Sequence, residues 1–195
     1  MHYKKLVKRH KTQEKQKMEK KWWHHLTAYQ IYTRSFCDSN GDGIGDFQGI
    51  ISKLDYLQEL GIGAIWISPF NDSPNYDNGY DISDYYAILK DFGTMADLEE
   101  MIQECEKRDI IVMMDLVLNH CSHEHPWFLG ACKDRNGKYH DYYIWEEGTE
   151  DQPPEGSAAF FGGNVWEWVP QVKEYYYHTF SIQQPDLNWN NENMR

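Results

Sequence analysis

The stretch that decides the fold is Asp115-Leu116-Val117-Leu118-Asn119-His120, which directly follows the apolar run Ile110-Ile111-Val112-Met113-Met114. An uninterrupted apolar run predicts a strand buried on both faces, because a half-exposed strand alternates with polar side chains. A carboxylate, an amide and an imidazole then appear where this strand leaves the core. In parallel α/β folds, the carboxyl end of a strand is where chemistry takes place. Alternatively, Asp115 caps a turn and His120 is a surface residue, and the spacing alone leaves both interpretations open.

Strands and helices alternate along the chain before this stretch. Residues 28–32 predict a short strand, and residues 62–68 predict a second buried strand. Apolar residues at helical spacing, Leu60 among them, predict a helix that ends at Gly61, and a second helix is expected over about 95–108. The order β-α-β-α-β predicts a parallel sheet with right-handed crossovers.

Two features favour a closed barrel over an open sheet. The loops after the strands are long and polar, whereas the connections from helices back into strands are as short as Gly61 or Asp109. No Gly-x-Gly-x-x-Gly opens a helix, so a dinucleotide-binding fold loses its main support. A barrel typically needs eight β/α units and about 250 residues. The sequence therefore predicts the first β/α units of an incomplete TIM (β/α)8 barrel, as in the front portion of a larger protein.

Length and composition narrow the class of protein. A chain of 195 residues can bury one sizeable core. No run of 18 apolar residues occurs and the amino terminus lacks the apolar segment of a secretion signal, so we expect no membrane span and a cytoplasmic location. The cysteines show no Cys-x-x-Cys pairing and no zinc-type spacing, which favours reduced thiols that bind no metal.

Charge is distributed unevenly along the chain. The net charge is −12, yet residues 1–25 carry +7, so the rest of the chain carries −19. That acidic body argues against a nucleic-acid partner, which would require a basic face. The basic segment could contact RNA or an anionic membrane. A solvated tail or a misassigned start is the favoured interpretation, and we expect residues 1–21 to be a disordered extension.

A metal loop is predicted after the first strand, at Asp38-Ser39-Asn40-Gly41-Asp42-Gly43-Ile44-Gly45-Asp46. Oxygen side chains fall at alternate positions and a glycine allows the sharp bend, as in the Ca²⁺ loops of EF-hands. Only hard oxygen ligands are present, so a structural Ca²⁺ is favoured and Mg²⁺ is the alternative. The bidentate Glu of an EF-hand is missing, because Gly49 stands at its position. Alternatively, Asp46 simply caps the next helix.

The loop after the second strand suits a sugar. It runs from Pro69 to Asp81, and its glycine and prolines predict a defined turn. Asp77 and Tyr80 bring a carboxylate and an aromatic face close together, so sugar hydroxyls could donate to the carboxylate while the C–H face lies on the ring. A plain surface turn is the alternative.

Several motifs in this order resemble the α-amylase family of glycoside hydrolases, family 13, and within it the oligo-1,6-glucosidase and α-glucosidase group. The resemblance runs from about Trp22 to Arg195. The motifs are Tyr29-Gln30-Ile31-Tyr32-x-Arg34-Ser35-Phe36, the loop from Asp38 to Asp46, Asp77-Asn78-Gly79-Tyr80-Asp81, Asp115 to His120, His125-Pro126-Trp127-Phe128, Phe161-Gly162-Gly163 and Gln184-Pro185-Asp186-Leu187-Asn188-Trp189.

The resemblance implies a pocket for a terminal glucosyl unit. Asp115 and His120 would line the subsite that holds the unit to be transferred. Asp77 would bind the hydroxyls of the non-reducing end, and Tyr80 would stack on the sugar ring. The same resemblance adds two aromatic walls, Phe161 and Phe180, and a Ca²⁺ site made by Asp38, Asn40, Asp42, the Ile44 carbonyl and Asp46.

The resemblance also implies a division of the chain. Residues 22–120 would be the amino-terminal part of the catalytic barrel, and residues 121–182 the small insert domain after the third strand. Residues 183–195 would return toward the fourth strand. The expected partner is a short α-glucoside, and we expect the full-length protein to be a monomer. Thr33 and Cys121 depart from the residues usual in the family, but neither is a predicted ligand.

The resemblance implies a retaining α-glucosidase, which needs two carboxyl groups about 5–5.5 Å apart. In this family the nucleophile follows a Gly-Phe-Arg-x-Asp pattern on the fourth strand and the acid/base Glu lies on the fifth, so both are expected beyond Arg195. These 195 residues alone should therefore be inactive. The alternatives are a trehalose-6-phosphate hydrolase, a sucrose-isomerase-like relative, or a non-catalytic amylase-like sugar-binding protein.

Overall fold

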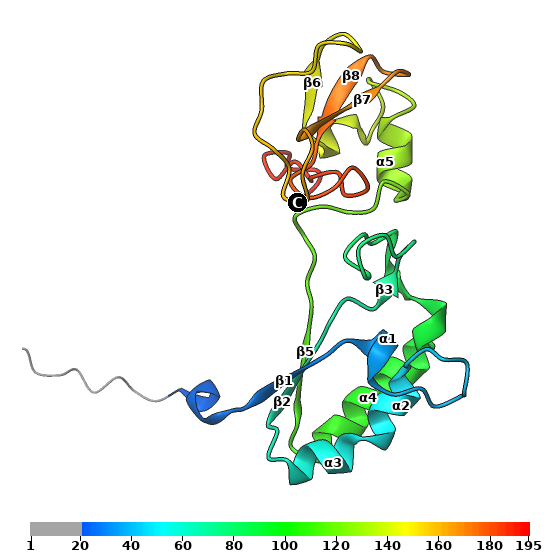
Figure 1. Ribbon diagram of the computed structural model, residues 1–195, viewed down its shortest axis with the longest axis vertical. Coiled ribbons are helices and arrows are strands. Elements are labelled where there is room, and N and C mark those ends of the chain that lie inside the picture. Colours follow the sequence, from blue (N-terminus) through cyan, green and yellow to red (C-terminus); the bar gives the residue numbers. More distant parts are fainter. Residues whose placement is uncertain (1–20) are drawn as a thin grey trace, which may run out of the picture.

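The computed structural model describes residues 21–195, and the expected basic extension lies outside this part except for Lys21. Figure 1 shows the arrangement of the elements. In chain order they are η1 (Trp22–His25), β1 (Ala28–Ile31), α1 (Thr33–Phe36), α2 (Phe47–Ser52), α3 (Leu54–Glu59), β2 (Ala64–Ile67), β3 (Asn71–Asp72), β4 (Asp84–Ile88), η2 (Lys90–Phe92), α4 (Met95–Glu106), β5 (Ile111–Met114), α5 (Pro126–Ala131), η3 (His140–Tyr142), β6 (Trp145–Glu147), β7 (Trp166–Val169) and β8 (Glu174–Tyr177).

The first sheet is parallel, with the order β1-β2-β5, as the alternation of strands and helices predicts. The last residues of its strands are in register, because Ile31 pairs with Ile67 and Ile67 pairs with Met114. The loops that follow these strands therefore leave from one edge of the sheet. The incomplete barrel expected from the sequence is confirmed.

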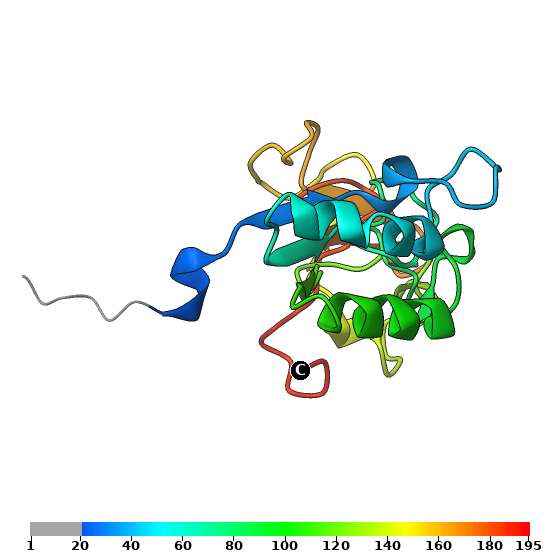
Figure 2. The ribbon, with the colours of Figure 1, turned by 90° about the horizontal axis from the view of Figure 1, so that it is seen from below.

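One face of this sheet is covered by helices. Viewed from below in Figure 2, the cyan helices α2 and α3 and the green helix α4 lie in one layer. Their buried side chains form one core with Ile31, Ile65 and Ile67 of the sheet. Helix α4 begins with a capping box in which Thr94 and Asp97 exchange hydrogen bonds, which satisfies free N–H groups at the helix start.

The prediction of a single helix before Gly61 is wrong, because the chain forms two helices, α2 and α3, with a break at Lys53, where φ is −107°. Gly61 has a φ of +80° and ends α3, and its N–H donates to the carbonyl of Gln58. Leu60 lies at the cap rather than on the buried stripe and is 53% exposed.

The expectation that the third strand is buried on both faces is also wrong. In β5, Ile111 and Met113 are each 39% exposed and Met114 is 55% exposed. The physical reason is position, because β5 is an edge strand with one strand neighbour and helices on one side only. Only Val112 of this strand packs against the core. The surface left open is apolar.

A second, antiparallel sheet with the order β6-β8-β7 lies above the first sheet in Figure 1. With α5 and η3 it encloses a separate core that includes Phe128, Tyr143 and Tyr176. Residues 115–120 run to it from β5 as an extended segment, and the chain returns in bridges that pair His120 with Asp186 and Tyr143 with Leu187. The exact division of the chain into domains stays a prediction. Within residues 21–195, no helix is long and apolar enough to cross a membrane.

Candidate functional site

Four of the six predicted sugar-binding residues come from two loops at the same edge of the parallel sheet. Asp77 and Tyr80 lie after β2, and Asp115 and His120 lie after β5. The backbone anchors the second loop to the sheet, because the N–H of Asp115 donates to the carbonyl of Ile67 at 3.2 Å. The two loops therefore start side by side.

A tight turn shapes the first loop. Asn78 and Gly79 both have positive φ, at 51° and 93°, and the N–H of Tyr80 donates to the carbonyl of Asp77. Asn-Gly is the pair that most readily adopts such a turn. The carboxylate of Asp81 is fully buried and accepts the N–H groups of Tyr76 and Asp77, each at 2.9 Å. Asp81 therefore fixes the backbone from which the Asp77 side chain extends.

Tyr80 joins the two loops. Its hydroxyl donates to Oδ2 of Asp115 at 3.0 Å. Burial, followed by the nearby Asp115 carboxylate, raises the pKa of Tyr80 to about 12. The phenol therefore stays protonated near neutral pH and holds the Asp115 carboxylate in place.

Gln184 connects the remaining two residues. Its side chain is fully buried, and its Nε2 donates to Oδ2 of Asp77 at 2.8 Å and lies 3.1 Å from Nε2 of His120. The sequence motif containing Gln184 carried the family resemblance, but nothing in its spacing predicted a place between Asp77 and His120. Its Oε1 makes no hydrogen bond among the described residues.

His120 is a buried residue, so its interpretation as a surface residue is wrong. Only 5% of it is exposed, and its ring lies edge-on to that of Phe180 with centroids 5.2 Å apart. Burial lowers the pKa of His120, although the carboxylates of Asp186, Asp77 and Asp81 oppose this shift. The imidazole is therefore neutral near pH 7, and one nitrogen can donate a hydrogen bond while the other accepts one.

The two predicted aromatic walls lie together at this site. The rings of Phe161 and Phe180 have centroids 6.2 Å apart, and Phe180 is the one that contacts His120. Phe161 is 60% exposed and lies farther out. Phe160, which the sequence did not indicate, also packs against Phe180, with centroids 5.6 Å apart. All six predicted sugar-binding residues thus belong to one connected group.

In the predicted metal loop, carboxylates accept hydrogen bonds from backbone N–H groups of the same loop. Asp38 accepts the N–H groups of Asn40, Gly41 and Gly43, and hydrogen bonds from Gly43 and Gly41 lower its pKa. Asp46 accepts the N–H of Gly49 at 2.6 Å, so it does cap α2, as the alternative proposed. In the described part of the chain, no three His, Cys, Asp or Glu side chains are grouped closely enough to hold a metal ion.

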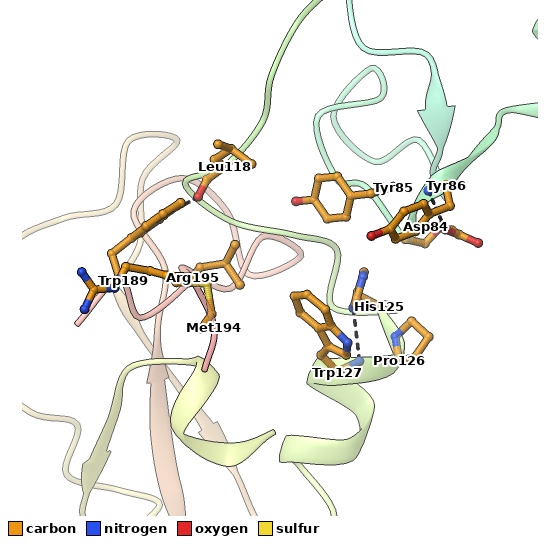
Figure 3. A pocket seen from close by; sticks show the side chains of 12 residues that line it. Asp84, Tyr85, Tyr86, Leu118, His125, Pro126, Trp127, Trp189, Met194 and Arg195 are labelled. Atoms are coloured by element: carbon orange, nitrogen blue, oxygen red, sulfur yellow. Dashed lines mark hydrogen bonds between the residues drawn. The ribbon is translucent and has the colours of Figure 1, made fainter. Parts of the chain in front are cut away.

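One cavity in the described part of the chain contains none of the six residues. It has a volume of about 540 Å³, and Figure 3 shows Tyr85 and Trp127 on one side of it, with Trp189 and Met194 across from them. Tyr85 links it to the site, because its hydroxyl donates to the backbone carbonyls of Val117 and His120, each at 3.0 Å. Its lining is mainly apolar, so we assign the chemistry to the carboxylate and imidazole group instead.

A parallel β/α sheet with acidic and aromatic side chains grouped at its carboxyl edge is the arrangement expected of the first part of a (β/α)8-barrel enzyme. Residues 30–195 match the family described as "Alpha amylase, catalytic domain". The chain belongs to the alpha-amylase family.

Characterised relatives share more than half of the residues in the matched region. The chain is 57% identical over 178 residues to an oligo-1,6-glucosidase of Bacillus cereus, covering 91% of this chain and 32% of the relative. It is 53% identical to a glucan 1,6-alpha-glucosidase of Streptococcus pneumoniae, with the same coverage. The chain thus spans about a third of the length of these relatives.

Solved structures agree with this assignment. The trehalose-6-phosphate hydrolase of Bacillus licheniformis superposes with a TM-score of 0.86 at 48% identity, over 90% of this chain and 32% of that one. An isomaltulose synthase from Klebsiella sp. LX3 superposes with a TM-score of 0.87 at 52% identity and the same coverage.

Proposed function

We propose that this chain forms the glucose-binding half of the active site of a retaining α-glucosidase that acts on the non-reducing end of short α-glucosides. The observation that carries the proposal is the connected group of side chains described above. Hydrogen bonds link Asp77 to His120 through Gln184, and Tyr80 to Asp115. Such fixed polar groups beside aromatic rings are what a sugar pocket requires.

Each side chain has a distinct task in this proposal. The carboxylates of Asp77 and Asp115 accept sugar hydroxyls, and the neutral His120 donates to another. The ring of Tyr80 faces the C–H surface of the sugar, and Phe180 closes the side of the pocket next to His120. Because Gln184 and Tyr80 already hold the two carboxylates, little side-chain freedom is lost when the sugar binds.

Catalysis itself would depend on a separate pair of carboxyl groups. Asp77 and Asp115 are assigned to binding, and the 195 residues contain no Gly-Phe-Arg-x-Asp pattern. We therefore propose that the nucleophile and the acid/base come from the remainder of a longer protein, as the relatives' greater length suggests. The chain of 195 residues should bind glucose without hydrolysing a glucoside.

The test combines binding with turnover on the 195-residue chain. Glucose titrated into the protein should shift NMR signals of Tyr80 and His120, and the Asp77→Ala variant should abolish these shifts. A nitrophenyl α-glucoside should not be hydrolysed. Measurable hydrolysis by the purified chain would contradict the assignment of Asp115 to binding, and glucose shifts confined to other residues would contradict the pocket.

A second candidate comes from the solved relatives, which include a trehalose-6-phosphate hydrolase and an isomaltulose synthase. The acidic loop after β1 favours the glucosidase, since the family resemblance associates its loss with trehalose-6-phosphate hydrolases. Isomaltose, sucrose and trehalose 6-phosphate offered to the longer protein that carries this chain would separate the activities. The glucosidase proposal expects isomaltose to be cleaved with the highest kcat/KM.

We also propose that the loop from Asp38 to Asp46 binds Ca²⁺, with Mg²⁺ as a weaker competitor. Its potential ligands are all oxygens. Asn40 would bind through its side-chain amide oxygen and Ile44 through its backbone carbonyl oxygen. Asp38 and Asp42 are already oriented by backbone N–H groups, at Gly43 and Ile44 among others. A bound ion would neutralise carboxylates that otherwise repel one another.

The cytoplasmic location and the monomeric state of the full-length protein remain predictions.

A further inference from the structure

A buried carboxylate holds the residue that precedes Phe180. Asp186 is 6% exposed, and its carboxylate accepts the backbone N–H of Thr179 at 2.9 Å and the hydroxyl of the same residue at 2.5 Å. Hydrogen bonds to a carboxylate are stronger than those between neutral groups. The carbonyl of Thr179 accepts the N–H of Phe160 at 2.8 Å. Each hydrogen-bonding group of Thr179 therefore has a partner.

The backbone of Asp186 also lies beside the pocket. Asp186 and His120 pair in an antiparallel bridge, where the chain that enters the second sheet meets the chain that leaves it. The ring of Phe180 in turn lies edge-on to that of His120, with centroids 5.2 Å apart. Asp186 is therefore linked to both rings, to His120 through its backbone and to Phe180 through Thr179.

Phe180 itself has few other restraints on its backbone. Residues 178–181 belong to no helix or strand, and within residues 21–195 neither the N–H nor the carbonyl of Phe180 makes a hydrogen bond. On its other side, the carbonyl of Ser181 accepts the N–H of Gln184 at 2.9 Å. The chain around Phe180 is thus held at its two neighbours, and the carboxylate bonds are those at Thr179.

We propose that Asp186 is a positioning residue that fixes Phe180 against His120 and thereby sets one wall of the sugar pocket. It acts on the sugar through Thr179 and Phe180 rather than by contact, since both of its carboxylate oxygens accept from Thr179 and little of its surface is exposed. The role of the wall rests on the proposed sugar pocket, whereas the placement of Phe180 does not.

The charge of Asp186 acts on the same imidazole and must be separated from its hydrogen bonds. Burial lowers the pKa of His120, and Asp186 is the foremost of the carboxylates that oppose this shift. Asp186→Asn removes the charge but keeps both bonds, because its amide oxygen can accept the Thr179 N–H and its amide N–H can donate to the Thr179 hydroxyl. Asp186→Ala removes the charge and the bonds. The two variants therefore separate position from charge.

NMR of the 195-residue chain tests the position without any sugar. At about pH 8, where an imidazole is neutral, the Phe180 ring displaces the signals of the His120 ring protons, and Phe180→Leu gives their values without that ring. Asp186→Ala should move these signals most of the way to the Phe180→Leu values. Asp186→Asn should keep them near those of the parent chain, and so should Asp151→Ala, a matched change in an exposed turn. Unchanged His120 signals in Asp186→Ala, or an equal change in Asp151→Ala, would overturn the proposal.

A milder pair of variants covers the case in which Asp186→Ala does not fold. Thr179→Val removes the hydroxyl donor, and Thr179→Ser retains it. The His120 signals should shift toward the Phe180→Leu values in Thr179→Val and stay near those of the parent chain in Thr179→Ser. Identical His120 signals in the two variants would overturn the role of Asp186.

Glucose titration tests the consequence for the pocket. Asp186→Ala should bind glucose about twofold to tenfold more weakly than the parent chain, which is the effect of having to order one side chain on binding. Asp186→Asn should restore most of the affinity. Equal affinity in Asp186→Ala and the parent chain would overturn the wall. A parent chain that binds no glucose would overturn the pocket and its wall together, while the His120 signals would still decide whether Asp186 places Phe180.

Discussion

A single buried amide connects the two halves of the proposed sugar pocket. Gln184 lies 107 positions after Asp77 in the chain, yet its Nε2 reaches both Asp77 and His120. His120 is buried, and a buried polar group that loses its hydrogen bond bears its full cost of desolvation. Gln184 should therefore control the affinity for sugar through the positions of its two partners.

Replacing this amide gives a prediction at the scale of a residue. Gln184→Leu should weaken glucose binding about tenfold to a hundredfold, because Asp77 and His120 lose the partner that orients them, and immobilising each side chain on binding costs about 0.5–1.5 kcal/mol. Titration of glucose by NMR or calorimetry measures the effect. Gln103→Leu, on the exposed side of α4, is the matched control and should bind like the parent chain. Equal affinity in the two variants would contradict the role of Gln184.

The buried imidazole of His120 predicts an acid-sensitive site. Because burial lowers its pKa below the ordinary value of 6.5, the unfolded chain takes up the proton first. The contribution of neutral His120 to folding is thus present above about pH 6.5 and lost as the pH falls below it. Chemical unfolding at pH 7 and pH 5 should show lower stability at pH 5, and His120→Gln should reduce the difference. A difference of the same size in the variant would contradict this.

At the scale of the element, the sequence predicted the strands, their order and the loops that carry the site. The β-α-β-α-β alternation is a local pattern, and so is the Asn78-Gly79 turn. The break at Lys53 depends on packing of α2 and α3 against the sheet, which spacing does not reveal. The contacts of Gln184 were equally out of reach, because they arise between segments far apart in the chain.

The loop from Asp38 to Asp46 gives a prediction at the same scale. Ca²⁺ at about a hundred times its Kd should stabilise the chain by about 2.7 kcal/mol, because it would bind only the folded loop. Thermal unfolding with Ca²⁺, with Mg²⁺ and with a chelator measures the shift. Asp42→Asn should remove it, whereas Asp151→Asn, in an exposed turn of the second sheet region, should leave it unchanged. A calcium shift retained in Asp42→Asn would contradict the site.

At the scale of the whole molecule, the prediction that failed is the burial of β5 on both faces, because one side of this strand is exposed. An apolar run normally indicates a strand that is buried on both faces. Such burial requires other elements of the chain to cover the strand, and in residues 21–195 β5 pairs only with β2. The apolar composition of β5 therefore suits a strand that is covered in a longer, closed barrel. The same reasoning explains why Leu116 is 73% exposed immediately after it.

This open face predicts how the isolated chain behaves. An unpaired edge strand with exposed apolar side chains promotes association, so the 195-residue chain should bind a hydrophobic dye and self-associate increasingly as its concentration is raised. Met114→Lys should reduce both, because a charge on an edge strand opposes pairing, while changing the unfolding midpoint little at this exposed position. Sedimentation and dye fluorescence measure the two effects. Leu60→Lys, an exposed apolar residue away from β5, is the control, and equal suppression by it would show that β5 is not the surface responsible.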